Sequence, residues 1–399
     1  MGVETGNVAA GVARAMSGWW LRIPFLALAA AGIVVLLQNS SPASAHQPFW
    51  RLTDPWEMRN HLEAARAILF GPSLHQWYAS GNTTGYAPPF ELLAVPLALL
   101  PDPVAAIAGR CLVAAALGLS LWLWQEGDRG VRIALWPVLI SLPALHALIT
   151  DHLFSAIGLL ALSLALWAQR RDRWYLVGVA AAVSLIRFTN ALPVIAMLVV
   201  GAWGSPTRAL RALGSGLVVV APLVAVTTWL DPSWPADYIH SLSFYPLAGW
   251  PRLAAAAGGG IGVAALQVAV VVVCAWLVRK RAGRPIDPDR SALGLALTIV
   301  SAPGEGPYTG IFTLPALARV GGRRGLGALP WFASAAAWAA LVVAGVLYVG
   351  PDWQSAWALF TLVATWFLIH GYPLLRPDLL IAASSPARMR SSPNSNSSP

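Results

Sequence analysis

DPWEMRNHLEAARAILFG (54–71) and GYAPPFELLAVPLALLP (85–101) follow the first long apolar stretch of this chain. These two segments are the most informative about the fold. The first segment spaces its apolar residues as a helix face does, which predicts an amphipathic helix that ends at Gly71-Pro72. In the second, Pro101-Asp102-Pro103 divides residues 87–124 into a short apolar piece and a longer one. The pattern predicts a helix at a membrane surface, then apolar helices of unequal length.

The composition indicates that apolar helices continue through the whole chain. Of 399 residues, 57% are hydrophobic and only 11% are charged, whereas a soluble domain carries about 25% charged residues. Apolar stretches near the ~20 residues needed to cross a bilayer recur from Trp19 to Leu375. We therefore expect an all-α, polytopic transmembrane helical bundle over 1–383, with roughly 10–13 spans by the same length rule. Residues 384–399 are rich in Ser, Pro and Asn and are expected to form a disordered cytoplasmic tail.

Basic residues gather in the links between apolar stretches, so the net charge of +9 indicates topology and not a nucleic-acid partner. The positive-inside rule assigns five links to the cytoplasm: Arg170–Arg173, Arg208–Arg211, Arg279–Arg290, Arg319–Arg324 and Arg376–Arg390. Six others then face outward: 39–86, 150–152, 187–190, 231–257, 302–310 and 350–353. All basic residues but Lys280 are arginine, which suggests a GC-rich genome and a bacterial plasma membrane. Cys111 and Cys274 lie in apolar stretches, which excludes a disulfide framework.

Three stretches need interpretation. Residues 17–38 resemble a signal peptide, but their length favours an uncleaved span. Residues 174–203 read as two short helices that meet at the outer surface near Arg187. If both pieces of 87–124 cross the membrane, the Gln125–Arg132 link faces outward and another crossing is required. If the first piece is re-entrant, all the basic links agree.

Asp54 is the main catalytic candidate, because a carboxylate at the outer membrane edge can act as a general base. A helix N-cap is the alternative reading, since Pro55 and Glu57 follow it as they do at helix starts. Glu57 and Glu63 are the competing carboxylates; Glu63 is expected to face solvent or headgroups.

Arg187 is the second candidate, because it is an isolated cation on the predicted outer side. It suits a phosphate clamp, since bidentate arginine–phosphate contacts are strong where water is scarce. A snorkelling arginine is the alternative.

These features resemble glycosyltransferase family 87 of the GT-C superfamily, the polyprenyl-phosphomannose-dependent mannosyltransferases. The resemblance covers about residues 20–320 and is carried by the early Asp54, by Tyr86-Ala87-Pro88-Pro89-Phe90 and by Pro96–Pro101. Asp151-His152 stands where the family often has Gly-Gln, and Ser184–Arg187 stands where it has a short apolar step that ends in Lys. Ser301–Tyr308 stands where the family has Ser-Pro followed by a His-Tyr pair. It departs at Pro307-Tyr308, where the family tends to carry His before Tyr. His152, His240, Glu305, Tyr308 and Tyr86 are then candidate substrate-binding residues.

The resemblance implies a sugar, mannose in the family, carried on a polyprenyl-phosphate donor. An acceptor hydroxyl of an envelope glycolipid or glycan attacks it on the outer face, with inversion and without a metal or other cofactor. Asp54 would take the proton and Arg187 would stabilise the departing phosphate. A transporter or flippase is the rival function; Arg110, deep in its apolar stretch, with Glu91 as its partner, favours it. An inactive GT-C scaffold is the third possibility, raised by the missing histidine.

Overall fold

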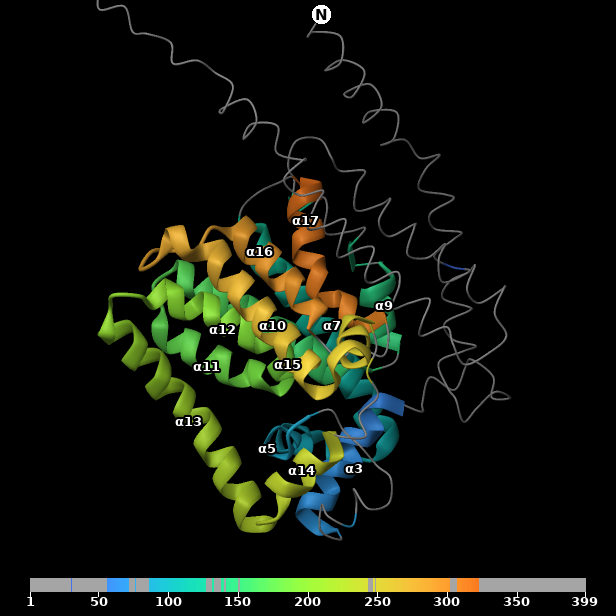
Figure 1. Ribbon diagram of the computed structural model, residues 1–399. Helices are drawn as coiled ribbons and strands as arrows, with labels where there is room; N and C mark the ends of the chain where they lie inside the picture. The colour runs from blue at the N-terminus through green and yellow to red at the C-terminus, as the bar shows by residue number, and fades with distance from the viewer. Residues whose placement is uncertain are drawn as a thin grey trace, which may run out of the picture.

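The computed structural model describes residues 56–71, 86–126, 131–132, 138–139, 141–149, 151–242, 249–301 and 307–322, with the single residues 30, 76 and 247. Every regular element in these ranges is helical (Figure 1). The α-helices are α3 (Trp56–Phe70), α5 (Pro88–Glu91), α6 (Val95–Ala98), α7 (Asp102–Gln125), α9 (Leu142–Ile149), α10 (Leu153–Arg170), α11 (Trp174–Ser184), α12 (Phe188–Ala202), α13 (Pro206–Leu230), α14 (Trp234–Leu242), α15 (Gly249–Val278), α16 (Pro288–Leu297) and α17 (Leu314–Gly322). The 3₁₀ turns are η1 (Leu92–Ala94), η2 (Leu185–Arg187), η3 (Arg279–Arg281), η4 (Thr298–Val300) and η5 (Pro307–Thr313).

Helix α10 forms the centre of the bundle. Phe154, Leu159, Leu162 and Leu166, spaced along it, are fully buried. Helix α7 packs beside α10 and runs in the same direction. Two contacts show this: Arg110 pairs with Asp151 toward the starts of the helices, and the Trp124 indole donates to Ser163 Oγ (3.0 Å) toward their ends. Two parallel neighbours require the chain to return to the first end between Glu126 and Asp151.

The first apolar piece of 87–124 does not cross the bundle. Residues 88–98 form α5, η1 and α6, which rise about 17 Å at 1.5 Å per residue, well short of a ~30 Å hydrocarbon core. Arg66 of α3 donates to Ala98 O (2.9 Å) and Asp102 Oδ1 (2.7 Å), which joins α3 to the end of α6 and the start of α7. The arrangement agrees with the re-entrant reading, and the link after Gln125 lies at the far end of α7.

The chain reverses direction at Arg187, as predicted for 174–203. By length and hydropathy Trp174–Ala202 counts as one span, but Trp174 and Trp203 line the same crevice, which a straight helix would prevent. The arms 174–187 and 188–202 each rise only about 21–22 Å. Arg187, where the two arms meet, is 7% exposed and so is covered by neighbouring side chains. That the arms meet on the outer side of a membrane stays a prediction.

Four of the five basic links gather at one end of the bundle, which we call the basic end. Arg170 pairs with Glu126 (2.6 Å) and Arg208 with Asp172 (3.0 Å). The buried pair Arg319–Asp289 (2.6 Å) lies there too, since Arg319 also donates to Trp124 O. The side chain of Gln169 donates to Arg284 O (3.0 Å) and so brings in the fourth link. Residues that the sequence assigns to one side of a membrane therefore meet in space.

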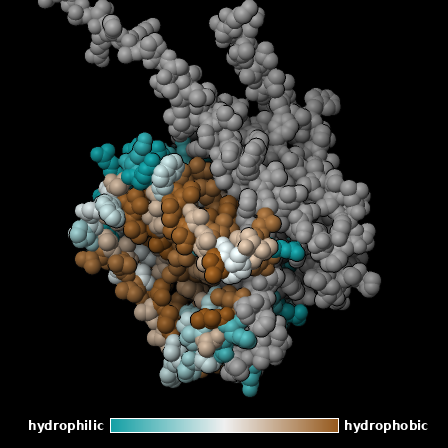
Figure 2. Space-filling model, viewed as in Figure 1, coloured by the Kyte–Doolittle hydropathy of each residue, from teal (hydrophilic) through white to brown (hydrophobic). Residues whose placement is uncertain are grey.

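Five helical segments of the described chain are long and apolar enough to cross a membrane: Asp102–Gln125, Leu153–Arg170, Trp174–Ala202, Pro206–Leu230 and Pro251–Arg281. Their outer surfaces carry large exposed hydrophobic side chains such as Leu217, Ile261 and Trp276. Figure 2 shows this apolar surface between hydrophilic regions above and below it. Such a belt needs a lipid environment, so the chain is a helical membrane protein. The expected spans near 17–38 and beyond 322, and the tail 384–399, lie outside the described residues.

Candidate functional site

Tyr86 and Arg187, separated by 101 residues, meet at the end of the bundle opposite the basic end, which we call the site end. Arg187 Nη1 donates to Tyr86 Oη (3.0 Å), and its guanidinium carbon lies 5.3 Å from the centre of the tyrosine ring. The arginine is held where η2 ends and α12 begins. Gly158 of α10 provides the space, since a Cβ there would lie 3.0 Å from Arg187 Cγ. The guanidinium is thus fixed on an aromatic ring inside the protein.

A second polar pair lies against the same tyrosine. His61 Nδ1 is 3.0 Å from Glu91 Oε2, and the two side chains are only 2% and 1% exposed. The imidazole ring meets the Tyr86 ring edge-on with centroids 4.7 Å apart, and it lies 4.2 Å from the Phe154 ring. Helix α3 places His61 there because Met58, Leu62 and Ala65 on the same face are buried in the core. We call His61, Tyr86, Glu91 and Arg187 the site cluster.

Helix α14 contributes Tyr238. Its hydroxyl is buried and makes no hydrogen bond within the described part of the chain. Burial, then the negative charge of Glu91 and the neighbouring Tyr86, raise the pKa of Tyr238 above its usual range. The neutral hydroxyl therefore persists at any physiological pH and can both donate and accept a hydrogen bond.

Asp151 and Arg110 form a third polar pair at this end. Asp151, which is 0% exposed, accepts a hydrogen bond at Oδ2 from Arg110 Nη2 (2.9 Å), and Arg110 Nε lies 2.9 Å from Asp151 Oδ1 in the same ion pair. Burial raises the pKa of Asp151 to about 6, although the Arg110 charge opposes the shift. The predicted partnership of Arg110 with Glu91 is therefore wrong: Glu91 pairs with His61 because α3 and α5 pack together. The Arg110 pair lies at the start of α10 and not at mid-depth of the bundle.

The remaining predicted residues are distributed as follows. His152 is buried, follows Asp151 and stacks on His146 with ring centres 5.5 Å apart. His240 is exposed on α14, so the structure does not bring it into the site cluster. Asp54 and Glu305 lie outside the described residues, as does the side chain of Tyr308. Glu63 is exposed and pairs with Arg59 of its own helix (3.6 Å), as expected for a residue facing solvent or headgroups.

Sequence reasoning missed His61 and treated Glu91 only as a partner for Arg110. The available signal was the position of His61 on the apolar face of a predicted amphipathic helix, between Met58 and Ala65. A polar side chain on that face must find a partner when the helix packs. Nothing local in the sequence identifies Glu91 as that partner.

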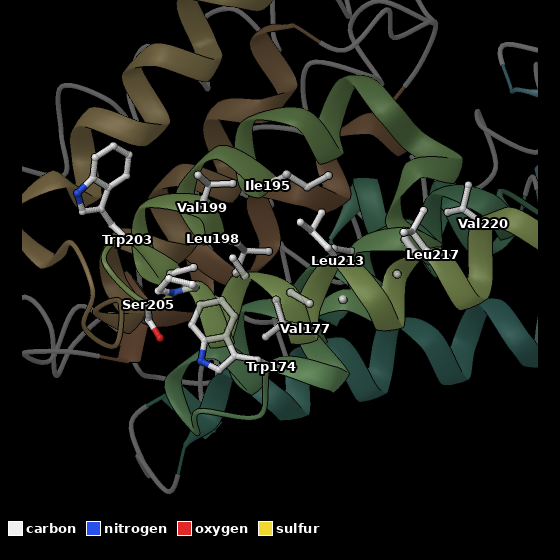
Figure 3. Close-up of a pocket in the computed structure, with 18 of the residues that line it drawn as sticks. Trp174, Val177, Ile195, Leu198, Val199, Trp203, Ser205, Leu213, Leu217 and Val220 are labelled. Carbon is white, nitrogen blue, oxygen red and sulfur yellow. The ribbon is translucent and has the colours of Figure 1, made fainter.

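An apolar crevice opens between α11, α12 and α13 (Figure 3). Its volume is about 820 Å³, and its walls include Leu185, Leu198 and Leu217, with Trp174 and Trp203 together at one end. No titratable side chain lines it. The crevice suits a hydrocarbon chain and cannot itself carry out acid–base chemistry.

The chemistry available at the site end is that of anion binding and proton transfer. A buried guanidinium favours a bidentate anion such as phosphate, and a carboxylate–imidazole pair can hold or move a proton. Among the described residues no group of three or more His, Cys, Asp or Glu side chains is arranged to bind a metal ion.

No protein-family model, curated protein or solved structure matches this chain.

Proposed function

We propose that this protein is a membrane glycosyltransferase that moves a sugar from a polyprenyl-phosphate donor to a hydroxyl of an envelope glycolipid or glycan. The observation that carries the proposal is Arg187, a guanidinium 7% exposed and held on Tyr86 inside an apolar bundle. A guanidinium held in a water-poor setting binds phosphate strongly and through two parallel contacts. A lipid-linked phosphate provides such a group and also has the hydrocarbon chain that a membrane protein can accommodate.

The crevice between α11, α12 and α13 supports a lipid substrate. It has only apolar and small side chains along its walls, and Leu185 on its wall is two residues from Arg187. A donor whose phosphate contacts Arg187 would have apolar surface nearby for its chain. The sequence proposes mannose as the sugar, through its resemblance to family 87, and the outer face of a bacterial plasma membrane as the place of reaction.

In the proposed reaction the acceptor oxygen attacks the anomeric carbon from the side opposite the phosphate, which inverts its configuration. The bond from that carbon to the phosphate oxygen breaks, and the electron pair leaves with the phosphate. Arg187 stabilises the charge that develops there, and interactions of this kind are worth about 3–4 kcal/mol. Asp54 is proposed as the base for the acceptor hydroxyl on the sequence argument alone.

A direct assay tests the proposal. Purified protein is incubated with a panel of radiolabelled polyprenyl-phosphate sugars and total envelope glycolipids, and transfer of label to the acceptor fraction is measured. Transfer from at least one donor, lost in Arg187→Ala, is the expected result. Absence of transfer across the panel, with folded protein, would refute the proposal and leave an inactive scaffold.

A transporter or flippase is the second candidate, and the buried Arg110–Asp151 pair is the observation in its favour. Charged side chains buried within membrane-protein bundles mark substrate or ion pathways in transporters. Liposomes that contain the protein and a fluorescent lipid would reveal it: lipid movement that Asp151→Asn abolishes would favour transport over transfer.

A further inference from the structure

Three basic links meet at one end of the crevice between α11, α12 and α13. Arg208 pairs with Asp172 (3.0 Å) and donates to Gly283 O (2.8 Å), which joins the three links in space. Trp174 and Trp203 lie at this end of the crevice (Figure 3). We call the surface formed by the three links the crevice mouth: residues 171–175, 203–211 and 281–285.

The crevice mouth is strongly basic. Its three links carry six arginines and one carboxylate, that of Asp172. Arg173, Arg211 and Arg284 are exposed. Helix α13 begins at the mouth with no acidic residue in its first turn and no side-chain cap, and the start of a helix favours an anion. The mouth therefore suits a negatively charged group.

Aromatic side chains accompany these cations. The Arg208 guanidinium lies 5.8 Å from the centre of the Trp174 ring, and that of Arg211 lies 5.5 Å from the Tyr175 ring. Trp203 is 70% exposed. Tryptophan and tyrosine gather where lipid headgroups meet hydrocarbon, and arginine binds the phosphates found there. The mouth thus has the side chains expected at the headgroup level of a bilayer.

Beyond the mouth, the crevice has the depth of one lipid leaflet. Its α13 wall runs from Pro206 to Val220, which is about 21 Å at 1.5 Å per residue. One leaflet contributes half of a ~30 Å hydrocarbon core. An acyl chain that enters from the mouth therefore stays between apolar walls along its length.

We propose that the crevice binds an anionic phospholipid of the leaflet at the basic end, with an acyl chain between α11, α12 and α13. The lipid phosphate lies at the crevice mouth on Arg208 and Arg211, one turn apart on α13. Basic pockets between membrane helices bind anionic headgroups in this way. The donor of the proposed function has its phosphate at the site end, near Arg187. This inference therefore goes beyond that function and does not rest on it.

Equilibrium binding to the purified full-length protein tests the site. Phosphatidylglycerol is titrated in a non-ionic detergent and bound lipid is measured by native mass spectrometry. Phosphatidylcholine with the same acyl chains is the zwitterionic comparison. We expect phosphatidylglycerol to bind more tightly, and its advantage should shrink at high salt, because salt screens exposed charges. Equal affinity for the two lipids would overturn the proposal.

Two arginine variants test the headgroup contacts. Arg208→Gln and Arg211→Gln should each weaken phosphatidylglycerol binding about fivefold, the effect of one basic residue near an anionic lipid. Phosphatidylcholine binding should not change. Arg132→Gln is the matched control, because Arg132 is exposed and bonds to Gln125 (3.2 Å) outside the crevice mouth. An equal loss in this control would show attraction to net charge alone and refute the site.

Filling the crevice tests the position of the acyl chain. Ala209 and Val199 line the crevice from α13 and α12, so Ala209→Phe and Val199→Trp should weaken binding of both lipids. Leu210→Phe is the control, because Leu210 is 69% exposed and lies outside the crevice lining. Binding that both filling variants leave unchanged, with the proteins folded, contradicts the proposal.

Polyprenyl monophosphate separates this site from the donor site. If it displaces phosphatidylglycerol from the wild-type protein, the crevice belongs to the donor chain and the phospholipid proposal fails. Persistence of bound phosphatidylglycerol supports two separate lipid sites. Sugar transfer by a protein that binds no phosphatidylglycerol refutes the phospholipid site and leaves the glycosyltransferase function standing.

Discussion

Replacing Arg187 by alanine is the sharpest test of the donor site. The structure gives the side chain a hydrogen bond to Tyr86 Oη at 3.0 Å, a position over its ring and an exposure of 7%. If it also holds the donor phosphate, its loss removes one charge-assisted contact in a water-poor site. Such a contact is worth about 1.5–3 kcal/mol, which corresponds to roughly 10- to 150-fold in kcat/KM for the donor. Acceptor KM should change little.

Two further substitutions separate the contributions of the Arg187 charge, its bidentate geometry and the Tyr86 hydroxyl to this loss of activity. Arg187→Lys keeps the charge and loses the bidentate fork, so part of the activity should return. Tyr86→Phe keeps the ring and removes one neutral hydrogen bond, worth about 0.5–1.5 kcal/mol, so it should cost roughly 2- to 12-fold. Tyr86→Phe should therefore be milder than Arg187→Ala.

The assay is steady-state kinetics with varied polyprenyl-phosphate sugar at saturating acceptor. Arg319→Gln is the control, because it removes another buried guanidinium, at the basic end. That control should lose stability without any change in donor KM. Equal donor kinetics in wild type and Arg187→Ala, with both proteins folded, would refute the phosphate clamp and favour a purely structural arginine.

Three further outcomes are expected. Asp54→Asn should lower turnover about 10²–10⁴-fold with folding intact; near wild-type turnover would show that the base is another residue. Cysteines at Ser233 and Ala282, both at exposed positions, should label from opposite sides of the membrane, with Ser233 outside; external labelling at Ala282 would reverse the orientation. Burial raises the pKa of Asp151 from 3.8 to about 6, so the folded state binds the proton more tightly. As pH rises from 3.8 to about 6, Asp151 ionises more readily in the unfolded state than in the folded state. The free energy of unfolding therefore falls over this range by about 3 kcal/mol in total. Asp151→Asn, which tolerates the left-handed backbone at φ 57°, should remove this loss relative to wild type in unfolding scans from pH 4 to 7.

Much of the architecture followed from the sequence. The amphipathic helix 54–71 was predicted and is α3, Trp56–Phe70. The break at Pro101-Asp102-Pro103 was predicted and separates α6 from α7. The reversal within 174–203 and the grouping of the basic links on one side were also predicted. Each of these features depends on local periodicity, on proline or on charge in short links, which act within a few residues.

The site cluster was predicted only in part. Tyr86 and Arg187 were both candidates, but that they bond to each other was not foreseen. The prediction that paired Arg110 with Glu91 was wrong, and His61 was not weighed at all. All of these depend on pairs separated by 30 to 101 residues, for which a single sequence gives no distance.

The sequence by itself determined that this chain forms a membrane-spanning helical bundle, because composition and apolar length reflect the free energy of transfer into lipid residue by residue. It also grouped the basic links on one side, and four of them lie at one end of the described bundle. Only the tertiary structure decided which polar side chains are partners. The pairs are His61 with Glu91, Arg110 with Asp151 and Arg187 with Tyr86. The physical reason is that a buried polar group must be satisfied by whatever packing brings within about 3 Å. That proximity arises from the crossing of helices and not from any property of the residues read one at a time.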